Sequence, residues 1–285
     1  MILRLFFRLK KSMMLILPHA NNYQTEIVTK IFQKIYTFLF FSLFMKDKTV
    51  EIAGFINFGM FLNRPNRFLV NLIPEGTTIS EKAFLHDPGR MKELLAPNAR
   101  LIIRKPLNQE NRKTSWDILA VEYNKMLVII KSSLPNVVAK EALTYGWIKE
   151  LSDYNLVKPE ITVGNSRLDF LLEKDDKKCF VEVKGVTLVK GNRAIFPDAP
   201  TERGARHLQE LIDLKLKGHR AVILFICMRE DPLIFSPNYE TDPKFSQQLK
   251  LAYESGVEIL VYKVLPRIIE NRLNITLNQK LNVEL

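Results

Sequence analysis

The stretch EITVGNSRLDFLLEKDDKKCFVEVKGVTLVK, residues 160–190, predicts two strands joined by a short charged turn. Its first half is rich in Leu and Phe, its second in Val and Phe, and residues 174–178 between them are polar. Because side chains alternate across a strand, Glu182 and Lys184 project from one face. Pairing of the two strands brings Asp169 near Glu182. We therefore expect two carboxylates and a lysine to converge on this hairpin.

These three side chains suit phosphodiester hydrolysis. Carboxylate oxygens are the ligands that Mg²⁺ and Mn²⁺ prefer, and a lysine beside the ion can stabilise charge on a phosphate or help to activate water. The hypothesis makes Asp169, Glu182 and Lys184 catalytic, with the two carboxylates holding Mg²⁺ or Mn²⁺. The alternative is a solvated ion pair on a strand surface, which the Glu-x-Lys tripeptide alone does not exclude.

A helix is expected before the hairpin, over residues 135–150. Its apolar stripe has helical spacing and consists of Val138, Ala142, Tyr145 and Ile148. Glu141 lies next to the stripe, so we expect it to face the sheet as a third metal ligand.

Helices and strands are also expected to alternate after the hairpin. Residues 201–217 predict a helix that Gly218 ends, followed by a strand over residues 221–228. A second helix is expected over residues 242–253, and another strand follows Gly256. This order predicts a sheet with helices on both faces.

Long stretches of the chain resemble one known family. SRLDFLL, VEVKGVTL and FPDAPTERGARHLQEL, with HDPGRMKELL, RKTSWD and SSLPN upstream, resemble the sugar fermentation stimulation protein A (SfsA) family, over residues 51 to about 264. The order helix, three strands, helix, strand, with an acid on the second strand and Glu-x-Lys on the third, resembles the PD-(D/E)xK nuclease superfamily. Where the SfsA family often has HCPNTGSM, this chain has HDPGRM at His86–Met91, a loop that the resemblance makes a candidate ligand contact.

The resemblance implies the fold class, α/β (α+β), with two domains. An OB-like small β-barrel that binds nucleic acid is expected over residues 45–113, where short strands alternate with turns. A nuclease-like mixed sheet flanked by helices is expected over residues 114–285. DNA is the expected partner ahead of RNA.

Residues 1–44 have no counterpart in the family pattern. The apolar run of residues 35–45 has 11 residues, whereas a membrane helix needs about 20. We expect translation to begin at Met45; an interfacial membrane anchor and an ordered extension are the alternatives.

Basic residues indicate where nucleic acid would bind. Residues 90–113 hold seven basic and two acidic side chains, and Phe58, Phe61 and Phe68 could stack bases in a barrel groove, unless they are core residues beside a solvated basic face. Arg203, Arg206 and His207 fall in the first turns of the helix after the hairpin, where backbone amides favour anions, although His207 could equally be a packing residue. The candidate nucleic-acid-binding residues are Arg90, Arg104, Lys105, Arg112, Lys113, Arg193, Arg203, Arg206 and His207.

Other cofactors are not expected. The two cysteines, Cys179 and Cys227, lie in expected core strands without zinc or redox spacing, as free thiols of a reducing cytoplasm would. No Gly-rich phosphate loop is present, so no nucleotide cofactor is expected, and a homodimer is left open. The sequence thus predicts a cytoplasmic DNA-binding protein with a metal-dependent nuclease site; the alternative is a non-catalytic DNA-binding regulator of sugar metabolism that uses the nuclease fold as a scaffold.

Overall fold

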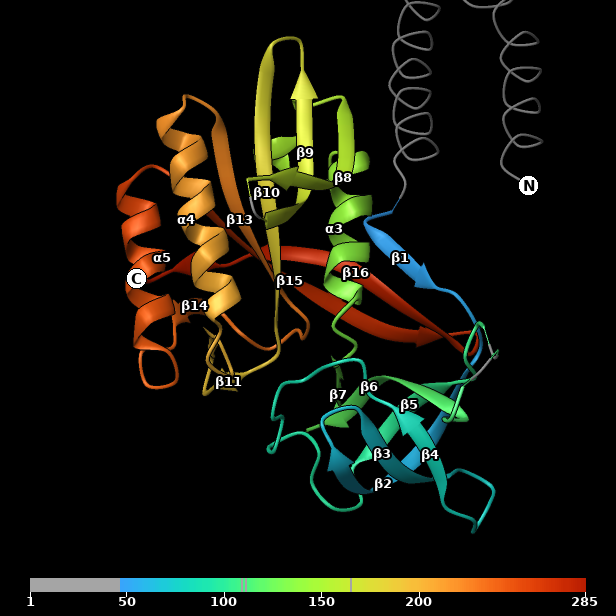
Figure 1. Ribbon diagram of the computed structural model, residues 1–285. Coiled ribbons are helices and arrows are strands. Elements are labelled where there is room, and N and C mark those ends of the chain that lie inside the picture. The colour runs from blue at the N-terminus through green and yellow to red at the C-terminus, as the bar shows by residue number, and fades with distance from the viewer. Residues whose placement is uncertain (1–46, 109, 111, 165) are drawn as a thin grey trace, which may run out of the picture. The chain divides into compact units, whose positions relative to one another are not determined.

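The structure is a computed structural model that describes residues 47–108, 110, 112–164 and 166–285 (Figure 1). The expectations for the first 45 residues, including the start at Met45 and the apolar run, lie outside this range. In the described part of the chain, no helix is long and apolar enough to cross a membrane.

Six strands form the barrel sheet, in the order β4-β3-β2-β5-β6-β7. An additional parallel pairing between β4 and β6 closes five of them into a barrel, which confirms the expected OB-like fold. Alternate side chains fill it: on β5, Leu101 and Ile103 point into the barrel core, whereas Ile102 packs into the core beneath the neighbouring sheet. The strands are β2 (Ile56–Asn66), β3 (Leu69–Pro74), β4 (Glu81–Phe84), β5 (Arg100–Arg104), β6 (Trp116–Tyr123) and β7 (Met126–Ile129).

The barrel sheet extends past residue 113, where the sequence placed the domain boundary. Strands β6 and β7 were expected to begin the nuclease-like domain, but β6 pairs with β5 and β7 pairs with β6, so both belong to the barrel sheet. Conversely β1 (Thr49–Ile52), placed in the barrel by sequence, pairs with β16 in the second sheet. The second domain is therefore built from two separate parts of the chain.

The second sheet has seven strands in the order β1-β16-β15-β13-β10-β9-β8, and β10, β13 and β15 run parallel. Strand β16, near the end of the chain, is an inner strand of this sheet, because it lies between β1 and β15. The strands are β8 (Leu156–Val163), β9 (Ser166–Lys174), β10 (Lys177–Val186), β13 (Arg220–Cys227), β15 (Glu258–Ile269) and β16 (Arg272–Lys280).

Helices cover both faces of this sheet, as expected (Figure 1). Helix α3 (Leu134–Thr144) packs on one face, and α4 (Glu202–Leu216) with α5 (Pro243–Glu254) on the other. Every residue of β13 from Ala221 to Cys227 is buried, because its side chains alternate between the two cores. Each fully buried large aliphatic side chain contributes about 1.5–3 kcal/mol.

The helix ends follow local chemistry. Thr201 and Asp242 cap α4 and α5 by accepting hydrogen bonds from Gly204 N and Phe245 N, each worth about 1 kcal/mol. Helix α3 is shorter than predicted: it ends at Thr144, and Gly146 turns the chain with φ +65°. Tyr145, expected in the apolar stripe, is exposed. A single 3₁₀ turn, η2 (Lys149–Leu151), follows.

A small third sheet begins between β10 and α4 in the chain. Strands β11 and β12 form a short hairpin there, which pairs with later strands in the order β11-β12-β14-β17. The strands are β11 (Val189–Lys190), β12 (Arg193–Phe196), β14 (Ile234–Pro237) and β17 (Asn282–Val283).

Candidate active site

Asp169, Glu182 and Lys184 come together where β9 and β10 diverge. The antiparallel pairing of these strands ends at the pair Val181 and Phe170, so Asp169, the next residue along β9, is not part of the ladder. There Oδ2 of Asp169 accepts a hydrogen bond of 2.8 Å from the backbone N–H of Val183. The carboxylate thus continues the ladder in place of a main-chain carbonyl, which fixes Asp169 beside Glu182.

Glu182 is the most enclosed member of the site, with only 2% of its surface exposed. Its Oε1 accepts a hydrogen bond of 2.6 Å from Nζ of Lys184 and another from Nδ1 of His207. Its Oε2 is buried and has no hydrogen-bond partner in the described structure. An unsatisfied buried carboxylate oxygen is costly, so Oε2 is the atom of this site that calls for a ligand.

The position of His207 corrects our expectation of a phosphate contact. Its side chain is 3% exposed, at the buried face of α4. Nε2 of His207 accepts a hydrogen bond of 3.4 Å from Nε of Arg203, so Nδ1 carries the hydrogen that His207 donates to Glu182. His207 is therefore a buried packing residue, as the alternative had it, and it also positions the carboxylate of Glu182.

Asn136 is a site residue that the sequence analysis did not single out. It lies in the first turn of α3, and its Nδ2 donates a hydrogen bond of 2.6 Å to Oδ1 of Asp169. The two carboxylates are thus held by helices on opposite faces of the sheet. The signal for Asn136 was its place in SSLPN, one of the stretches that resembles the family.

The two carboxylates differ in acidity. Burial, and then the negative charge of Glu182, raise the pKa of Asp169 above its ordinary value. Burial also acts to raise the pKa of Glu182, but the hydrogen bond from His207 and the charge of Lys184 outweigh it, and the net shift is downward. Glu182 is therefore the more acidic carboxyl group of the pair.

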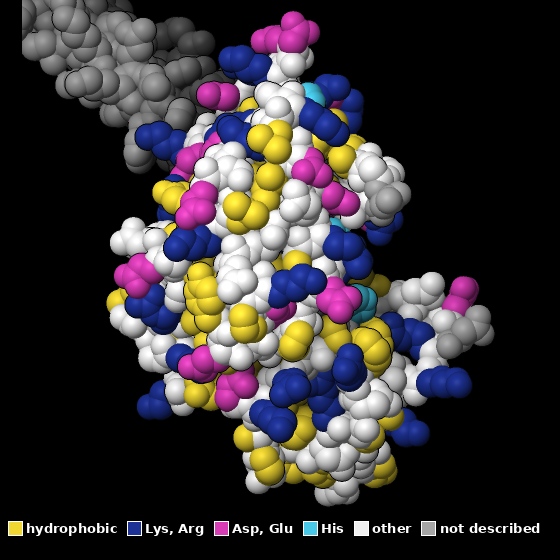
Figure 2. Space-filling view, turned by 60° about the vertical axis from the view of Figure 1, so that its left-hand side comes forward, with side chains coloured by type: hydrophobic (Ala, Val, Ile, Leu, Met, Phe, Trp, Pro, Cys, Tyr) yellow, Lys and Arg dark blue, Asp and Glu magenta, His cyan; other side chains and the backbone are white. Residues whose placement is uncertain are grey.

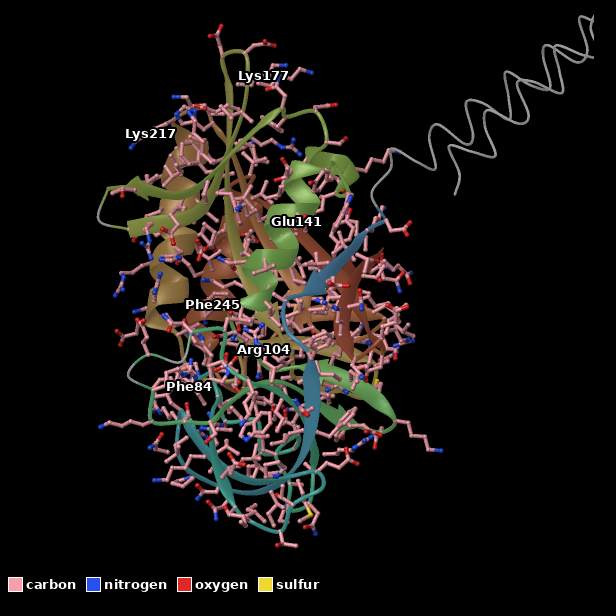
Figure 3. All side chains as sticks on the ribbon, turned by 90° about the vertical axis from the view of Figure 1, so that its right-hand side faces the viewer. Phe84, Arg104, Glu141, Lys177, Lys217 and Phe245 are labelled. Carbon is pink, nitrogen blue, oxygen red and sulfur yellow. The ribbon has the colours of Figure 1, made fainter. Side chains whose placement is uncertain are left out.

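A divalent cation fits the residues present. Mg²⁺ is commonly bound through only one or two carboxylates, with substrate oxygens and water completing the shell. In the part of the chain that the structure describes, Oε2 of Glu182 has no hydrogen-bond partner. Asp169 lies nearby, and its pKa is raised in part by the charge of Glu182, as expected for two acids that could share a cation. Within the described residues no group of three or more His, Cys, Asp or Glu side chains is arranged to hold a metal ion. Glu141 is half-buried on α3 (Figure 3), and its role as a third ligand stays a prediction.

Arg104, a predicted nucleic-acid contact, is structural instead. It is 6% exposed, donates a hydrogen bond to the carbonyl of Ala53, and lies 3.6 Å from Asp117. Asp117 also forms ion pairs with Arg112 at 2.6 Å and with Lys131 at 3.2 Å. These charges form a buried network that joins β5, β6 and the chain after β7.

The remaining predicted contacts are exposed or partly exposed. Lys105 lies over the ring of Trp116, Arg193 pairs with Glu284, and the others lie at the surface; as a set they are Arg90, Lys105, Arg112, Lys113, Arg193, Arg203 and Arg206. Figure 2 shows Lys and Arg side chains gathered on the lower part of one face, where the barrel lies. Of the three phenylalanines, Phe61 is core, Phe58 is partly buried under Arg100, and Phe68 is exposed.

Comparison with known proteins agrees with this architecture. Residues 62–130 match the SfsA N-terminal OB domain, and residues 133–267 match the sugar fermentation stimulation protein RE domain. These matches place the boundary near residue 131, where the barrel sheet ends.

Individual relatives extend over most of the chain. The chain is 44% identical to a sugar fermentation stimulation protein homolog of Moorella thermoacetica, covering 75% of this chain and 92% of the relative. A homolog of Methanosphaera stadtmanae is 40% identical, covering 73% and 87%. The solved structure of Pyrococcus furiosus SfsA in complex with Ca²⁺ matches with a TM-score of 0.74 and 31% identity, covering 83% of this chain and 98% of that one. This chain belongs to the sugar fermentation stimulation protein family.

Proposed function

We propose that this protein is a metal-dependent phosphodiesterase that cleaves nucleic acid at Asp169, Glu182 and Lys184. The observation that carries the proposal is Oε2 of Glu182, which is buried beside a second carboxylate and has no hydrogen-bond partner among the described residues. Sequestering a carboxylate oxygen in this way costs folding free energy, and a bound divalent cation would offset that cost.

Each side chain has a distinct part in the proposal. Asp169 and Glu182 hold Mg²⁺ or Mn²⁺, which when bound would supply Lewis acidity to the phosphoryl group. Lys184, 17% exposed at its side chain, keeps Nζ within reach of incoming solvent and of Glu182 Oε1. Its ammonium stabilises negative charge as it develops on the phosphate, or exchanges a proton with the attacking water. His207 and Asn136 orient the two carboxylates.

Two further observations support the proposal. The related Pyrococcus furiosus protein was solved in complex with Ca²⁺, a hard cation that also takes oxygen ligands. The chain from residue 45 onward carries 36 Lys and Arg against 30 Asp and Glu, which favours an anionic substrate. The basic side chains on the barrel face in Figure 2 suit a phosphate backbone, with DNA ahead of RNA.

One observation favours a second candidate, a DNA-binding regulator with the nuclease fold as scaffold. Lys184 and His207 both pair with Oε1 of Glu182, so the same contacts can serve as a buried ion-pair network that stabilises the sheet. A regulator of this kind would bind DNA equally with and without divalent metal, and its affinity would fall with salt.

Cleavage of labelled single- and double-stranded DNA and RNA separates the two candidates. The native chain is compared with Lys184→Met and Asp169→Asn, in Mg²⁺, Mn²⁺ or EDTA, and Asp176→Asn in the exposed hairpin turn is the matched control. The proposal expects metal-dependent cuts that both site variants lose by about 10²-fold or more and the control retains. Salt-sensitive binding with no cleavage of any substrate would favour the regulator.

A further inference from the structure

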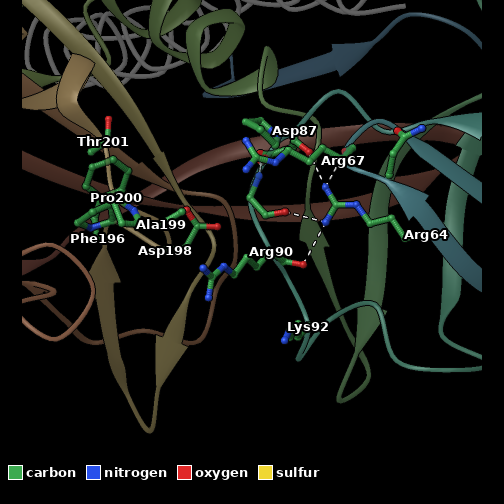
Figure 4. Close-up of a pocket in the computed structure, with 14 residues that line it drawn as sticks. Arg64, Arg67, Asp87, Arg90, Lys92, Phe196, Asp198, Ala199, Pro200 and Thr201 are labelled. Atoms are coloured by element: carbon green, nitrogen blue, oxygen red, sulfur yellow. Dashed lines mark hydrogen bonds between the residues drawn. The ribbon is translucent and has the colours of Figure 1, made fainter.

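A second feature, a polar pocket of about 680 Å³, lies between the barrel and the segment before α4 (Figure 4). One wall is the loop after β4, with Asp87, Gly89 and Arg90, and the other is the segment around Asp198. The walls are in close contact, because a methyl group added at Gly89 would collide with the carboxylate of Asp198. The volume is in the range of sites that hold small molecules or single nucleotides.

Arg64 makes the barrel wall rigid. Its guanidinium donates hydrogen bonds to four backbone carbonyls, those of Arg67 (2.7 Å), Asp87 (2.8 Å), Gly89 (2.6 Å) and Arg90 (3.0 Å). Figure 4 shows these bonds converging on one side chain. The loop is thus held in a defined shape by an arginine that has no hydrogens left for a ligand except at Nε.

Three other cations line the same pocket and are available for a ligand. Arg67, Arg90 and Lys92 are exposed, and their side chains form no ion pair or hydrogen bond with any other described residue. Unpaired cations on a rigid loop suit phosphate oxygens.

The pocket is also lined by two carboxylates, which accept hydrogen bonds, so it differs from a site that binds only anions. Asp87 and Asp198 face it from opposite walls, and burial followed by their mutual repulsion raises the pKa of Asp87 to about 6. Such a pair favours a ligand that also donates hydrogen bonds. A nucleotide has both properties, since its phosphate accepts and its base amino or sugar hydroxyl groups donate.

A second cavity adjoins the pocket. A smaller cavity of about 90 Å³ shares Asp87 and Asp198 with it and is lined further in by Gly185 and Pro135. Gly185 follows Lys184 in the chain, and Pro135 precedes Asn136. The lining of this cavity thus includes the chain neighbours of two site residues. A strand bound at Lys184 that passed these neighbours would enter the pocket.

We infer that this pocket is a subsite for an unpaired stretch of DNA flanking the phosphate that is cut, held by Arg67, Arg90 and Lys92. The inference rests on the proposed function for its link to cleavage. The substrate class we assign is single-stranded DNA, or a strand end opened from a duplex, because the pocket lies between two walls that approach each other closely at Gly89 and Asp198.

The salt dependence of binding tests the inference. Anisotropy of a labelled single strand of about twelve nucleotides, within the site sizes known for OB folds, is measured in EDTA over a range of salt concentrations. The native chain is compared with the double variant Arg90→Ala/Lys92→Ala. Lys177→Ala/Lys217→Ala is the control with equal charge change, since both residues are exposed and lie at the end away from the barrel (Figure 3).

The inference expects the log–log salt slope to become shallower by about 1.4 in the double variant, about 0.7 for each lost phosphate contact, and to stay unchanged in the control. It also expects a duplex of the same sequence to compete poorly. Equal slopes in the native chain and the double variant, or a duplex that competes as well as the single strand, would overturn it.

The same preparations are scored for cleavage in Mg²⁺, which keeps the two proposals apart. Cleavage by the native chain with an unchanged salt slope refutes the subsite alone. A changed slope with no cleavage from any preparation leaves the binding pocket in place and refutes the proposed function.

Discussion

His207 donates a hydrogen bond from Nδ1 to Oε1 of Glu182, and so ties α4 to the third strand of the hairpin region. Oε2 of the same carboxylate has no hydrogen-bond partner among the residues that the structure describes, so it is the oxygen that remains available to a ligand. Helix α4, through His207, thus occupies Oε1 of Glu182 and not Oε2.

Replacing His207 is expected to lower both stability and cleavage. His207→Ala removes a buried charge-assisted hydrogen bond, so the free energy of unfolding should fall by about 2–3 kcal/mol in urea titrations. His207→Asn keeps a donor near Glu182 and should recover part of the activity. Gln209→Ala, exposed on the same helix, is the control; equal activity in His207→Ala and the control would contradict a positioning role.

Divalent metal is expected to stabilise the native chain through Asp169 and Glu182. A ligand at one hundred times its dissociation constant adds about 2.7 kcal/mol to the free energy of unfolding, which raises the melting temperature by several degrees. Thermal melts with and without Mg²⁺, Mn²⁺ or Ca²⁺ should show this shift in the native chain and lose it in Asp169→Asn. A shift of equal size in that variant would place the metal elsewhere.

The pH dependence of stability should carry a contribution from Asp87. Its pKa is raised from 3.8 to about 6 in the fold, chiefly by burial, so between these pH values the folded chain binds more protons than the unfolded chain. The contribution of Asp87 therefore favours folding at low pH and is lost as pH rises from about 4 to 6, by up to about 3 kcal/mol.

Asp87→Asn removes this titration, so its free energy of unfolding should rise relative to the native chain as pH increases over that window. Urea denaturation at several pH values measures the difference. A difference that does not change with pH would show that Asp87 titrates normally in the folded chain.

Arg104→Met tests the corrected role of Arg104. Because it leaves Asp117 with fewer partners in a buried network, we expect a loss of about 3–5 kcal/mol in the free energy of unfolding. Below the melting transition, DNA affinity should stay unchanged. Lys105→Met, at the exposed neighbour, should cost no more than about 1 kcal/mol, the worth of a cation over Trp116.

Local patterns in the chain were sufficient for much of the fold. The alternation in residues 166–186 predicted a hairpin and the meeting of Asp169, Glu182 and Lys184, because strands joined by a short turn pair with their nearest neighbour. Gly218 and Asp242 marked helix ends correctly, since caps depend on residues within one turn. The buried free thiols of Cys179 and Cys227 were also predicted from their apolar strands.

Only the tertiary structure decided which distant segments meet. Strand β1 pairs with β16 more than 200 residues later, β6 closes the barrel by pairing with β4, and Asp198 meets the barrel loop at Gly89. No local period distinguishes an inner strand from an edge strand, because both alternate alike.

Local patterns also did not show whether a single charged side chain is buried or exposed. The sequence determined that Asp169, Glu182 and Lys184 converge. It did not determine that His207 and Arg104 are buried, because the local sequence around an arginine or histidine does not show whether its side chain faces solvent or a buried carboxylate. That choice is made when the core closes, since a charge is buried only where its partner from another element is already in place.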